Sequence, residues 1–264
     1  MPETELLHIT RPRPGVLLLE LDDPATKNAL TAEMVTELRA AFASAATDPL
    51  AKVVVLTGRG RVFSSGGNTK TMGDARPRPL ERKRYMWSHV QRLFREIHLV
   101  DTPLLVAING TAVGAGVDLA LHGDLRLMAV EASLRAGYID LGVVPGGGGA
   151  YLLPRIVGQA KALEILWTGR VVDAPEAERI GIVARVVPAE ALLDTTLELA
   201  ALIATKPAQS LQLIKRMVDQ SFDVPLSAAL DAASSHFAVL QETDDHAEGV
   251  DALRARRPPT FRDS

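Results

Sequence analysis

The sequence contains no cysteine, few aromatic residues, no long apolar run and no large excess of one charge. The absence of cysteine excludes disulfides, thiolate zinc sites and a cysteine nucleophile. Lys and Arg number 29 against 32 Asp and Glu, so no basic field attracts nucleic acid, and we expect no such partner. No apolar stretch is long enough for a membrane span, and the acidic start does not resemble a secretory signal. We therefore expect a soluble, cytoplasmic protein without a membrane partner.

Aliphatic residues make up most of the predicted core. Hydrophobic residues account for 47% of the 264 residues and aromatics for only 4%, so the core is expected to be rich in Val, Leu, Ile and Ala. Short β-branched runs alternate with helical segments, which favours parallel strands joined by helical crossovers and an α/β fold. Strands are predicted at 16–21, 53–56, 104–108 and 125–130, and helices at 31–46, 80–99 and 116–122.

The chain changes character near residue 188. Beyond Pro188 the pattern is almost entirely helical, with breaks at the prolines 207 and 225. We therefore divide the chain into a core domain over residues 1–188 and a C-terminal helical region over residues 189–264. Apolar faces on the C-terminal helices indicate burial against the body or a neighbouring subunit.

Two glycine-rich turns are the most informative feature. Residues 63–68 (FSSGGN) follow the strand at 53–56, and residues 109–118 (NGTAVGAGVD) follow the strand at 104–108. A strand that ends in small residues and opens a helix leaves backbone N–H groups pointing into a cleft. Two such turns facing each other would supply two donors to one oxygen, which is an oxyanion hole suited to acyl chemistry. The alternative is that the glycines only allow tight strand–helix packing.

The ordered set of motifs resembles the crotonase, or enoyl-CoA hydratase/isomerase, superfamily nearly from end to end. The motifs are LDDP at 21–24, KNAL at 27–30, the two glycine turns, LGVVPGGGG at 141–149, EG at 248–249, and RRP at 256–258 with Phe261. The resemblance implies a right-handed spiral of strand–strand–helix turns and a C-terminal helical trimerisation region. It implies a homotrimer, or a hexamer of two trimers. It also implies an acyl-CoA thioester as substrate, with CoA as part of that substrate and no separate cofactor or metal.

The resemblance assigns the oxyanion hole and the CoA contacts by position. The two donors are the backbone N–H groups of Gly67 and Ala115. Lys27 and Ala29 lie in the segment that contacts CoA in the family, and Lys70 is a further candidate for a phosphate. Arg257, with its neighbour Arg256, lies where the tail of an adjacent subunit reaches CoA in the family. The alternative for these basic residues is an ordinary solvated surface.

The acid–base residues depart from the pattern of the family. Family hydratases hold water between two glutamates. The first position is Asp118, one methylene shorter, and the second, seven residues before Pro145, is Tyr138. Tyrosine has a pKa near 10 and is a poor base at neutral pH, but its hydroxyl can orient water. Asp140, two residues further on, is a further catalytic candidate, and the alternative for it is a cap or a salt bridge at a subunit interface. The alternative for Asp118 is a purely structural acid in the first turn of its helix, where the helix dipole favours a negative charge.

We predict an enzyme that stabilises a thioester enolate, most directly by hydrating a 2-enoyl-CoA. In this hypothesis Asp118 and Tyr138 position the water, and Asp118 is the principal acid and base. The altered acid pair leaves isomerisation, decarboxylation or carbon–carbon lysis on the same oxyanion hole as alternatives. Gly146, directly after the proline, argues against isomerases that place an acid there. A weakly catalytic subunit that binds acyl-CoA is an alternative from a different class.

Overall fold

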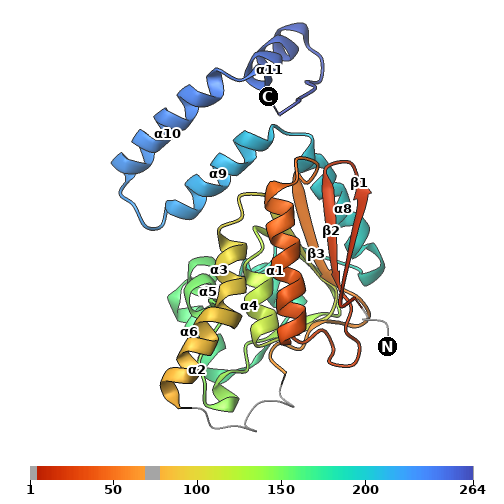
Figure 1. Cartoon of the computed structure of the whole chain (residues 1–264), viewed down its shortest axis with the longest axis vertical. Helices are drawn as coiled ribbons and strands as arrows, with labels where there is room; N and C mark the ends of the chain where they lie inside the picture. Colours follow the sequence, from red (N-terminus) through yellow and green to blue (C-terminus); the bar gives the residue numbers. More distant parts are fainter. Residues whose placement is uncertain (1–4, 69–77, 264) are drawn as a thin grey trace.

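A six-stranded sheet is the central element of the computed structural model, which describes residues 5–68 and 78–263 (Figure 1). The strands, in sheet order, are β1 (Leu7–Arg13), β2 (Val16–Leu21), β3 (Val53–Gly58), β5 (Leu104–Ile108), β7 (Leu125–Ala129) and β10 (Arg185–Val187). Only the β1–β2 pair is antiparallel among these described strands. Every residue of β3 and β5 is buried, because helices cover both faces of this parallel sheet.

A smaller sheet consists of short strands that each follow a strand of the larger sheet, with one exception. Its order is β4 (Val62–Ser64), β6 (Thr111–Val113), β8 (Ser133–Arg135) and β9 (Val171–Asp173), of which β9 alone follows a helix. The chain thus passes from β3 to β4, from β5 to β6 and from β7 to β8 before the next helix or turn. This succession is the strand–strand–helix repeat that the family resemblance implies, whereas the sequence pattern alone predicts only strand, turn and helix. Both glycine-rich turns overlap strands of the smaller sheet, because residues 63–68 include the end of β4 and residues 109–118 include β6.

The body of the molecule has helices on both faces of the larger sheet and others beside the smaller sheet. They are α1 (Ala32–Thr47), α2 (Pro79–Tyr85), η1 (Met86–Val90), α3 (Gln91–His98), α4 (Ala115–Leu121), α5 (Gly149–Val157), α6 (Gln159–Thr168), α7 (Ala174–Arg179) and α8 (Ala189–Ala204). Side chains alternate across a strand, so Leu19 and Leu56 pack toward α1, whereas Leu18 and Val55 pack toward α8. Thr31 caps α1 as predicted, its hydroxyl accepting from the Met34 N–H at 3.2 Å. The predicted helix at 80–99 contains a π-helical turn, η1.

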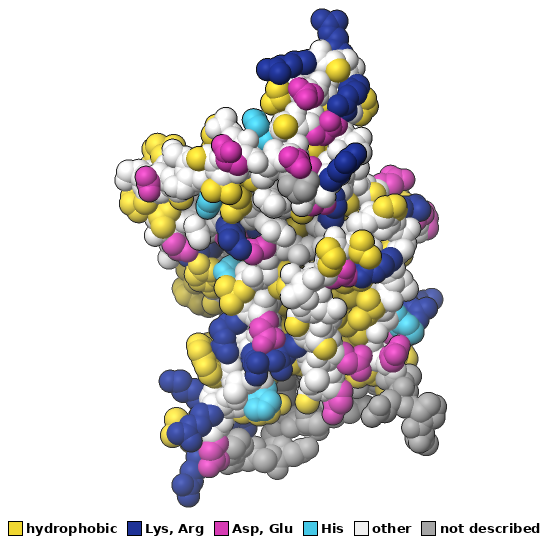
Figure 2. All heavy atoms as spheres, turned by 45° about the horizontal axis from the view of Figure 1, so that its top comes forward, with side chains coloured by type: hydrophobic (Ala, Val, Ile, Leu, Met, Phe, Trp, Pro, Cys, Tyr) yellow, Lys and Arg dark blue, Asp and Glu magenta, His cyan; other side chains and the backbone are white. Residues whose placement is uncertain are grey.

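Three further helices form an arm that extends from the body (Figure 1). They are α9 (Ala208–Gln220), α10 (Leu226–Gln241) and α11 (Asp244–Ala255). None of the residues in α9 or α10 is buried, and large apolar side chains such as Phe222, Leu226 and Phe237 are more than half exposed. Figure 2 shows hydrophobic side chains on the surface of this arm. α8 packs on the larger sheet, so the arm begins after α8. The division into domains at residue 188 stays a prediction.

Candidate active site

The first glycine turn is held by the segment that precedes α1. Asn28 has a left-handed backbone conformation, with φ at 57°, which asparagine tolerates better than most residues. Its buried amide donates to the carbonyls of Val62 at 2.9 Å and Phe63 at 3.2 Å. The Leu30 N–H then donates to the Gly66 carbonyl at 2.8 Å. These hydrogen bonds tie the first glycine turn to the segment that precedes α1.

The two glycine-rich turns meet where Gly66 faces the start of α4. A Cβ on Gly66 would lie 2.2 Å from the Val113 carbonyl oxygen and 3.0 Å from the Ala115 nitrogen, so only glycine fits. Gly67 follows directly, which places both predicted oxyanion donors at this junction. Within residues 5–68 and 78–263, neither the Gly67 N–H nor the Ala115 N–H has an acceptor. Two backbone donors are therefore available to a ligand oxygen here.

Asp118 lies in the first turn of α4, and its residue is only 1% exposed. Its Oδ2 accepts from the Tyr138 hydroxyl and from the Gly147 N–H, both at 2.7 Å. The Gly149 N–H also donates to the carboxylate, and a Cβ on Gly149 would lie 2.3 Å from Oδ1. The structure thus brings the predicted pair Asp118 and Tyr138 into direct contact, inside a cradle of backbone donors.

Burial dominates the electrostatics of this pair. It raises the pKa of Asp118 to about 6, although the three hydrogen bonds to the carboxylate favour its charged form. The cause is an apolar environment, including a cavity of about 10 Å³ beside the carboxylate that Leu121, Leu134 and Leu153 help to line. Burial and the adjacent carboxylate raise the pKa of Tyr138 above its ordinary value. At neutral pH, Asp118 is mainly ionised and Tyr138 is a hydrogen-bond donor.

Asp140 is not brought to this cluster. It lies in the 3-10 turn η2 (Ile139–Leu141), where it is about half exposed and pairs with Arg135 at 2.9 Å. In a 3-10 turn, successive side chains point about 120° apart, so residues 138 and 140 do not share a face as they would in a strand. This ion pair lies within one chain, whereas the sequence left open a salt bridge at a subunit interface.

The candidate CoA residues are spread over the chain. Lys27 is exposed beside the first glycine turn, and its carbonyl accepts from the Ser65 N–H at 2.9 Å. Ala29 is buried, and its N–H already donates to Thr26 Oγ1 at 3.1 Å. Arg257 follows α11 and pairs with Glu248 through two contacts of 2.6 and 2.7 Å. This end of the arm is distant from the glycine turns within one chain (Figure 1). Lys70 lies outside the described residues.

Three residues of the site were not anticipated in their present role. Gly147 and Gly149 belong to a run of four glycines for which the sequence predicts close packing and a flexible pocket wall. Their N–H groups instead hold Asp118. The Nε2 atom of His122, at the end of α4, lies 2.8 Å from the Gly147 carbonyl oxygen. No residue type signals a backbone donor, so sequence patterns alone do not reveal this cradle.

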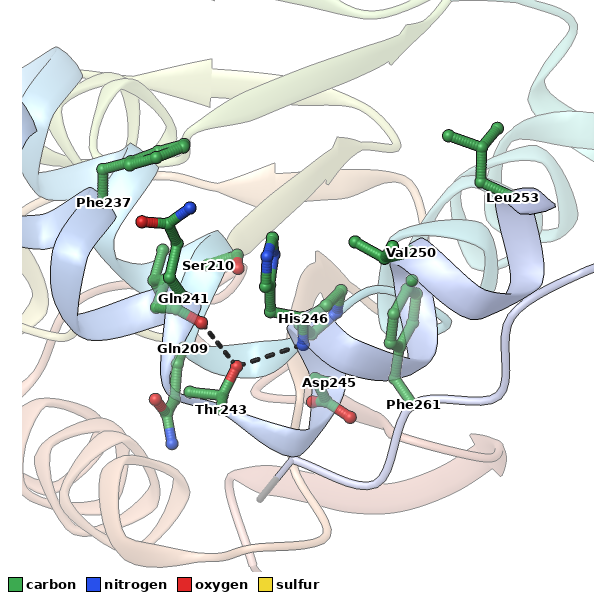
Figure 3. A pocket seen from close by; sticks show the side chains of 13 residues that line it. Gln209, Ser210, Phe237, Gln241, Thr243, Asp245, His246, Val250, Leu253 and Phe261 are labelled. Atoms are coloured by element: carbon green, nitrogen blue, oxygen red, sulfur yellow. Dashed lines mark hydrogen bonds between the residues drawn. The ribbon is translucent and has the colours of Figure 1, made fainter.

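A separate hollow of about 390 Å³ lies between α9, α10 and α11 (Figure 3). Phe237, Val250 and Phe261 line it, and none of the predicted site residues does. Thr243 shapes its rim, because its hydroxyl accepts from the His246 N–H at 3.1 Å and caps α11. This hollow belongs to the arm and takes no part in the arrangement around Asp118.

Two features are absent from the part of the chain that the structure describes. There, no helix is both long and apolar enough to cross a bilayer. In the same residues, no group of three or more His, Asp or Glu side chains is arranged to hold a metal ion.

Comparison with known proteins gives consistent matches over the whole chain. The family model for enoyl-CoA hydratase/isomerase matches residues 11–264. The chain is 36% identical to the probable enoyl-CoA hydratase echA12 of Mycobacterium bovis, over 98% of this chain and 93% of that protein. It is 33% identical to the 2,3-dehydroadipyl-CoA hydratase of Escherichia coli, over 94% and 95%. A crystal structure of an enoyl-CoA hydratase subunit I from Geobacillus kaustophilus matches with a TM-score of 0.92 and 35% identity, over 99% of this chain and 100% of that one.

Proposed function

The chain belongs to the enoyl-CoA hydratase/isomerase family, and we propose that it is a hydro-lyase that adds water across the 2,3 double bond of an acyl-CoA thioester. Its α/β fold with a helical C-terminal region is the crotonase fold, as the sequence predicted. The observation that carries the proposal is Asp118, a buried carboxylate with a pKa of about 6, on the same helix as Ala115. Among the described residues, the N–H groups of Ala115 and Gly67 have no acceptor. This arrangement fits a base for water and a binding site for a developing oxyanion.

The oxyanion hole stabilises the enolate in this proposal. When a water oxygen bonds to C3, the electron pair of the double bond moves toward the thioester carbonyl oxygen. The N–H groups of Gly67 and Ala115 donate to that oxygen. Donors that are already oriented stabilise the new charge without reorganising, which is worth several kcal/mol in typical enzymes.

Asp118 moves the proton in the same scheme. Its carboxylate takes one proton from the attacking water and returns it to C2 of the enolate, so hydroxyl is added at C3 and hydrogen at C2. A pKa near the working pH suits a group that must both accept and release a proton. The second family glutamate is not needed for atom balance, because a single carboxylate carries the proton in both directions.

Tyr138 orients this carboxylate, and the Tyr138→Phe variant tests that role. We expect kcat to fall about 10- to 100-fold, because the carboxylate loses a positioning hydrogen bond. The lost bond stabilised the charged form, so the pKa of Asp118 is expected to rise and the acid limb of the rate profile to move to higher pH. Stopped-flow rates between pH 5 and 8 measure both effects.

The matched control is Tyr151→Phe. Tyr151, on α5, also donates its hydroxyl to a carboxylate, that of Asp223 at 3.2 Å, but both residues are exposed and lie outside the cluster. Its loss is expected to leave kcat and the pH profile unchanged. Equal effects of the two variants would contradict the role of Tyr138.

The proposal extends to assembly and location. We propose a homotrimer or a hexamer, supported by the exposed apolar side chains of α9 and α10 and by the position of Arg257 at the end of the arm. In such an assembly, Arg257 reaches the CoA of an adjacent subunit. CoA enters as part of the substrate, and no further cofactor is proposed. A cytoplasmic location is supported by the cysteine-free composition, which suits a reducing compartment.

The direct test is the loss of absorbance at the enoyl-thioester band. We expect crotonyl-CoA, or a longer or aromatic enoyl-CoA, to lose this band and yield the 3-hydroxyacyl-CoA. If the esters bind and no enoyl-CoA is hydrated, the proposed reaction is wrong. Isomerisation, decarboxylation, carbon–carbon lysis or a binding role on the same fold would then be tested with the corresponding substrates.

A further inference from the structure

We propose that His122 is a positioning residue for Asp118 and acts through the backbone of Gly147. Asp118 and His122 are four positions apart along α4 and therefore lie on one face of the helix. His122 Nε2 lies 2.8 Å from the Gly147 carbonyl oxygen, and the Gly147 N–H donates to Asp118 Oδ2 at 2.7 Å. One residue of the glycine run is thus held at both of its polar groups by α4. The kinetic part of this inference rests on the proposed function.

The contact determines the tautomer of His122. A carbonyl oxygen only accepts, so the proton must be on Nε2. Burial lowers the pKa of His122 to about 4, so the ring is neutral at physiological pH. Its Nδ1 atom is then an acceptor, and this buried atom has no partner among the described residues. An unpaired buried acceptor costs stability, and an apolar side chain here would avoid that cost. What His122 provides, and an apolar side chain would not, is the hydrogen bond to the Gly147 carbonyl.

The glycine run needs an external support. Four consecutive glycines, 146–149, have large conformational freedom. Gly147 has no room for a side chain of its own, because a Cβ would lie 2.5 Å from the Phe94 ring and 2.8 Å from Asp118 Oδ2. Side chains from neighbouring helices hold the run instead. Gln91 donates to the Gly146 carbonyl at 3.0 Å, and His122 binds the next carbonyl.

The surroundings of the imidazole keep it in this state. The Phe94 ring of α3 stacks on it with ring centroids 5.2 Å apart, and His98 meets it edge-on at 6.2 Å. The charged or titratable groups that face His122 are His98 from α3 and Lys215 from α9, and positive charge on either disfavours protonation of His122. Asp118 is one turn away on the same helix. No step of the proposal requires His122 to change its charge.

Loss of the His122 donor should therefore act on Asp118. The glycine run would move more freely, and the Gly147 N–H would be a poorer donor to the carboxylate. Since this bond favours the charged form, the pKa of Asp118 should rise, and the orientation of the base should be less well defined. CoA binding should be unaffected, because His122 does not line the junction of the two glycine turns.

The test uses His122→Phe, which keeps an aromatic ring beside Phe94, and His122→Gln, which retains a side-chain N–H donor. We expect His122→Phe to lower kcat about 10-fold with KM within about twofold of the wild-type value. The acid limb should move up by about half a pH unit. His122→Gln should recover most of the rate. The control Thr196→Val removes another buried hydrogen bond to a carbonyl, that of Leu192, and should lower Tm without changing kcat.

Two NMR readouts do not depend on turnover. The ¹⁵N shifts of the His122 ring should show the neutral Nε2–H tautomer, and the Asp118 carboxyl ¹³C titration should move to higher pH in His122→Phe. A protonated Nδ1, an unchanged Asp118 titration, or an unchanged kcat in an active enzyme would each overturn the proposal. If the wild-type protein hydrates no enoyl-CoA, the proposed function fails, while the two NMR readouts still decide whether His122 positions Asp118.

Discussion

Asp118→Asn is expected to lower kcat for enoyl-CoA hydration about 1,000-fold while leaving acyl-CoA binding nearly unchanged. In the proposed mechanism, the substitution removes the group that carries the proton between water and C2, and general acid–base catalysis is typically worth 10²- to 10⁴-fold. The side chain keeps its shape, so Tyr138 and Gly147 still find an oxygen acceptor. Steady-state hydration rates, together with a binding titration using a saturated acyl-CoA, separate the two effects.

The same substitution is expected to raise the stability of the folded protein, although it lowers kcat. The folded-state pKa of Asp118 is about 6 against 3.8 for the free side chain. For an acid whose pKa is raised by folding, stability is lost as pH rises between these two values. Above pH 6 the buried carboxylate costs about 3 kcal/mol, and Asn carries no such charge. Part of this gain is offset, because the Asn amide group would face the Gly149 N–H. Relative to wild type, the variant is therefore expected to gain Tm between pH 4 and pH 7.

The control for this prediction is Asp140→Asn. Asp140 is an acid in the segment of Tyr138, but it pairs with Arg135 at the surface. Its loss is expected to change kcat less than twofold, since exposed ion pairs contribute about 0 to 1 kcal/mol and this one does not contact Asp118. A large loss of rate in Asp140→Asn, or full activity in Asp118→Asn, would reverse the assignment of the base.

Gly66→Ala is expected to reduce kcat about 100- to 1,000-fold, the range observed when an oxyanion-hole donor is lost. The new methyl group would lie 2.2 Å from the Val113 carbonyl oxygen, so one of the two glycine-rich turns must move. In the proposed oxyanion hole, the Gly67 and Ala115 N–H groups would then no longer converge on one oxygen. Rates of hydration at saturating enoyl-CoA, with Tm by calorimetry, measure the result.

Backbone strain must be separated from loss of the oxyanion hole, and Gly60→Ala provides the control. Gly60 has φ at +77° against +79° for Gly66, but a Cβ there would meet nothing within 4 Å. Both variants pay about 1 kcal/mol for a left-handed alanine. Only Gly66→Ala should lose activity beyond its loss of stability. Similar kcat values in the two variants would show that the turns do not need their present spacing.

The long, regular elements could be predicted from the sequence. The predicted strands at 16–21 and 104–108 match β2 and β5, and the helix capped by Thr31 is α1. The smaller sheet could not be predicted, because three-residue strands such as β6 and β8 are too short to show alternation. The strands β4, β6 and β8 each follow a strand of the larger sheet and find partners that are distant in sequence.

The candidate site shows the same division. The two glycine-rich turns and Asp118 could be identified from local patterns and family position. The sequence predicts that Asp118 and Tyr138 together position a water molecule but does not predict a contact between them. The structure shows a hydrogen bond between the two side chains. Gly147 and His122 were missed because their roles depend on a loop that returns to α4 about 25 residues later. Asp140 was misplaced because an isolated 3-10 turn leaves no periodic signal.

The glycine cradle has a consequence for how the chain can vary over evolutionary time. A side chain at position 147 or 149 would collide with the carboxylate of Asp118, so glycine is required at both positions for as long as an acid of this size occupies position 118. Position 138 has no such restriction, because its side chain approaches the acid only through a terminal hydroxyl. New chemistry can therefore enter through a single exchange at position 138, while the cradle is inherited unchanged.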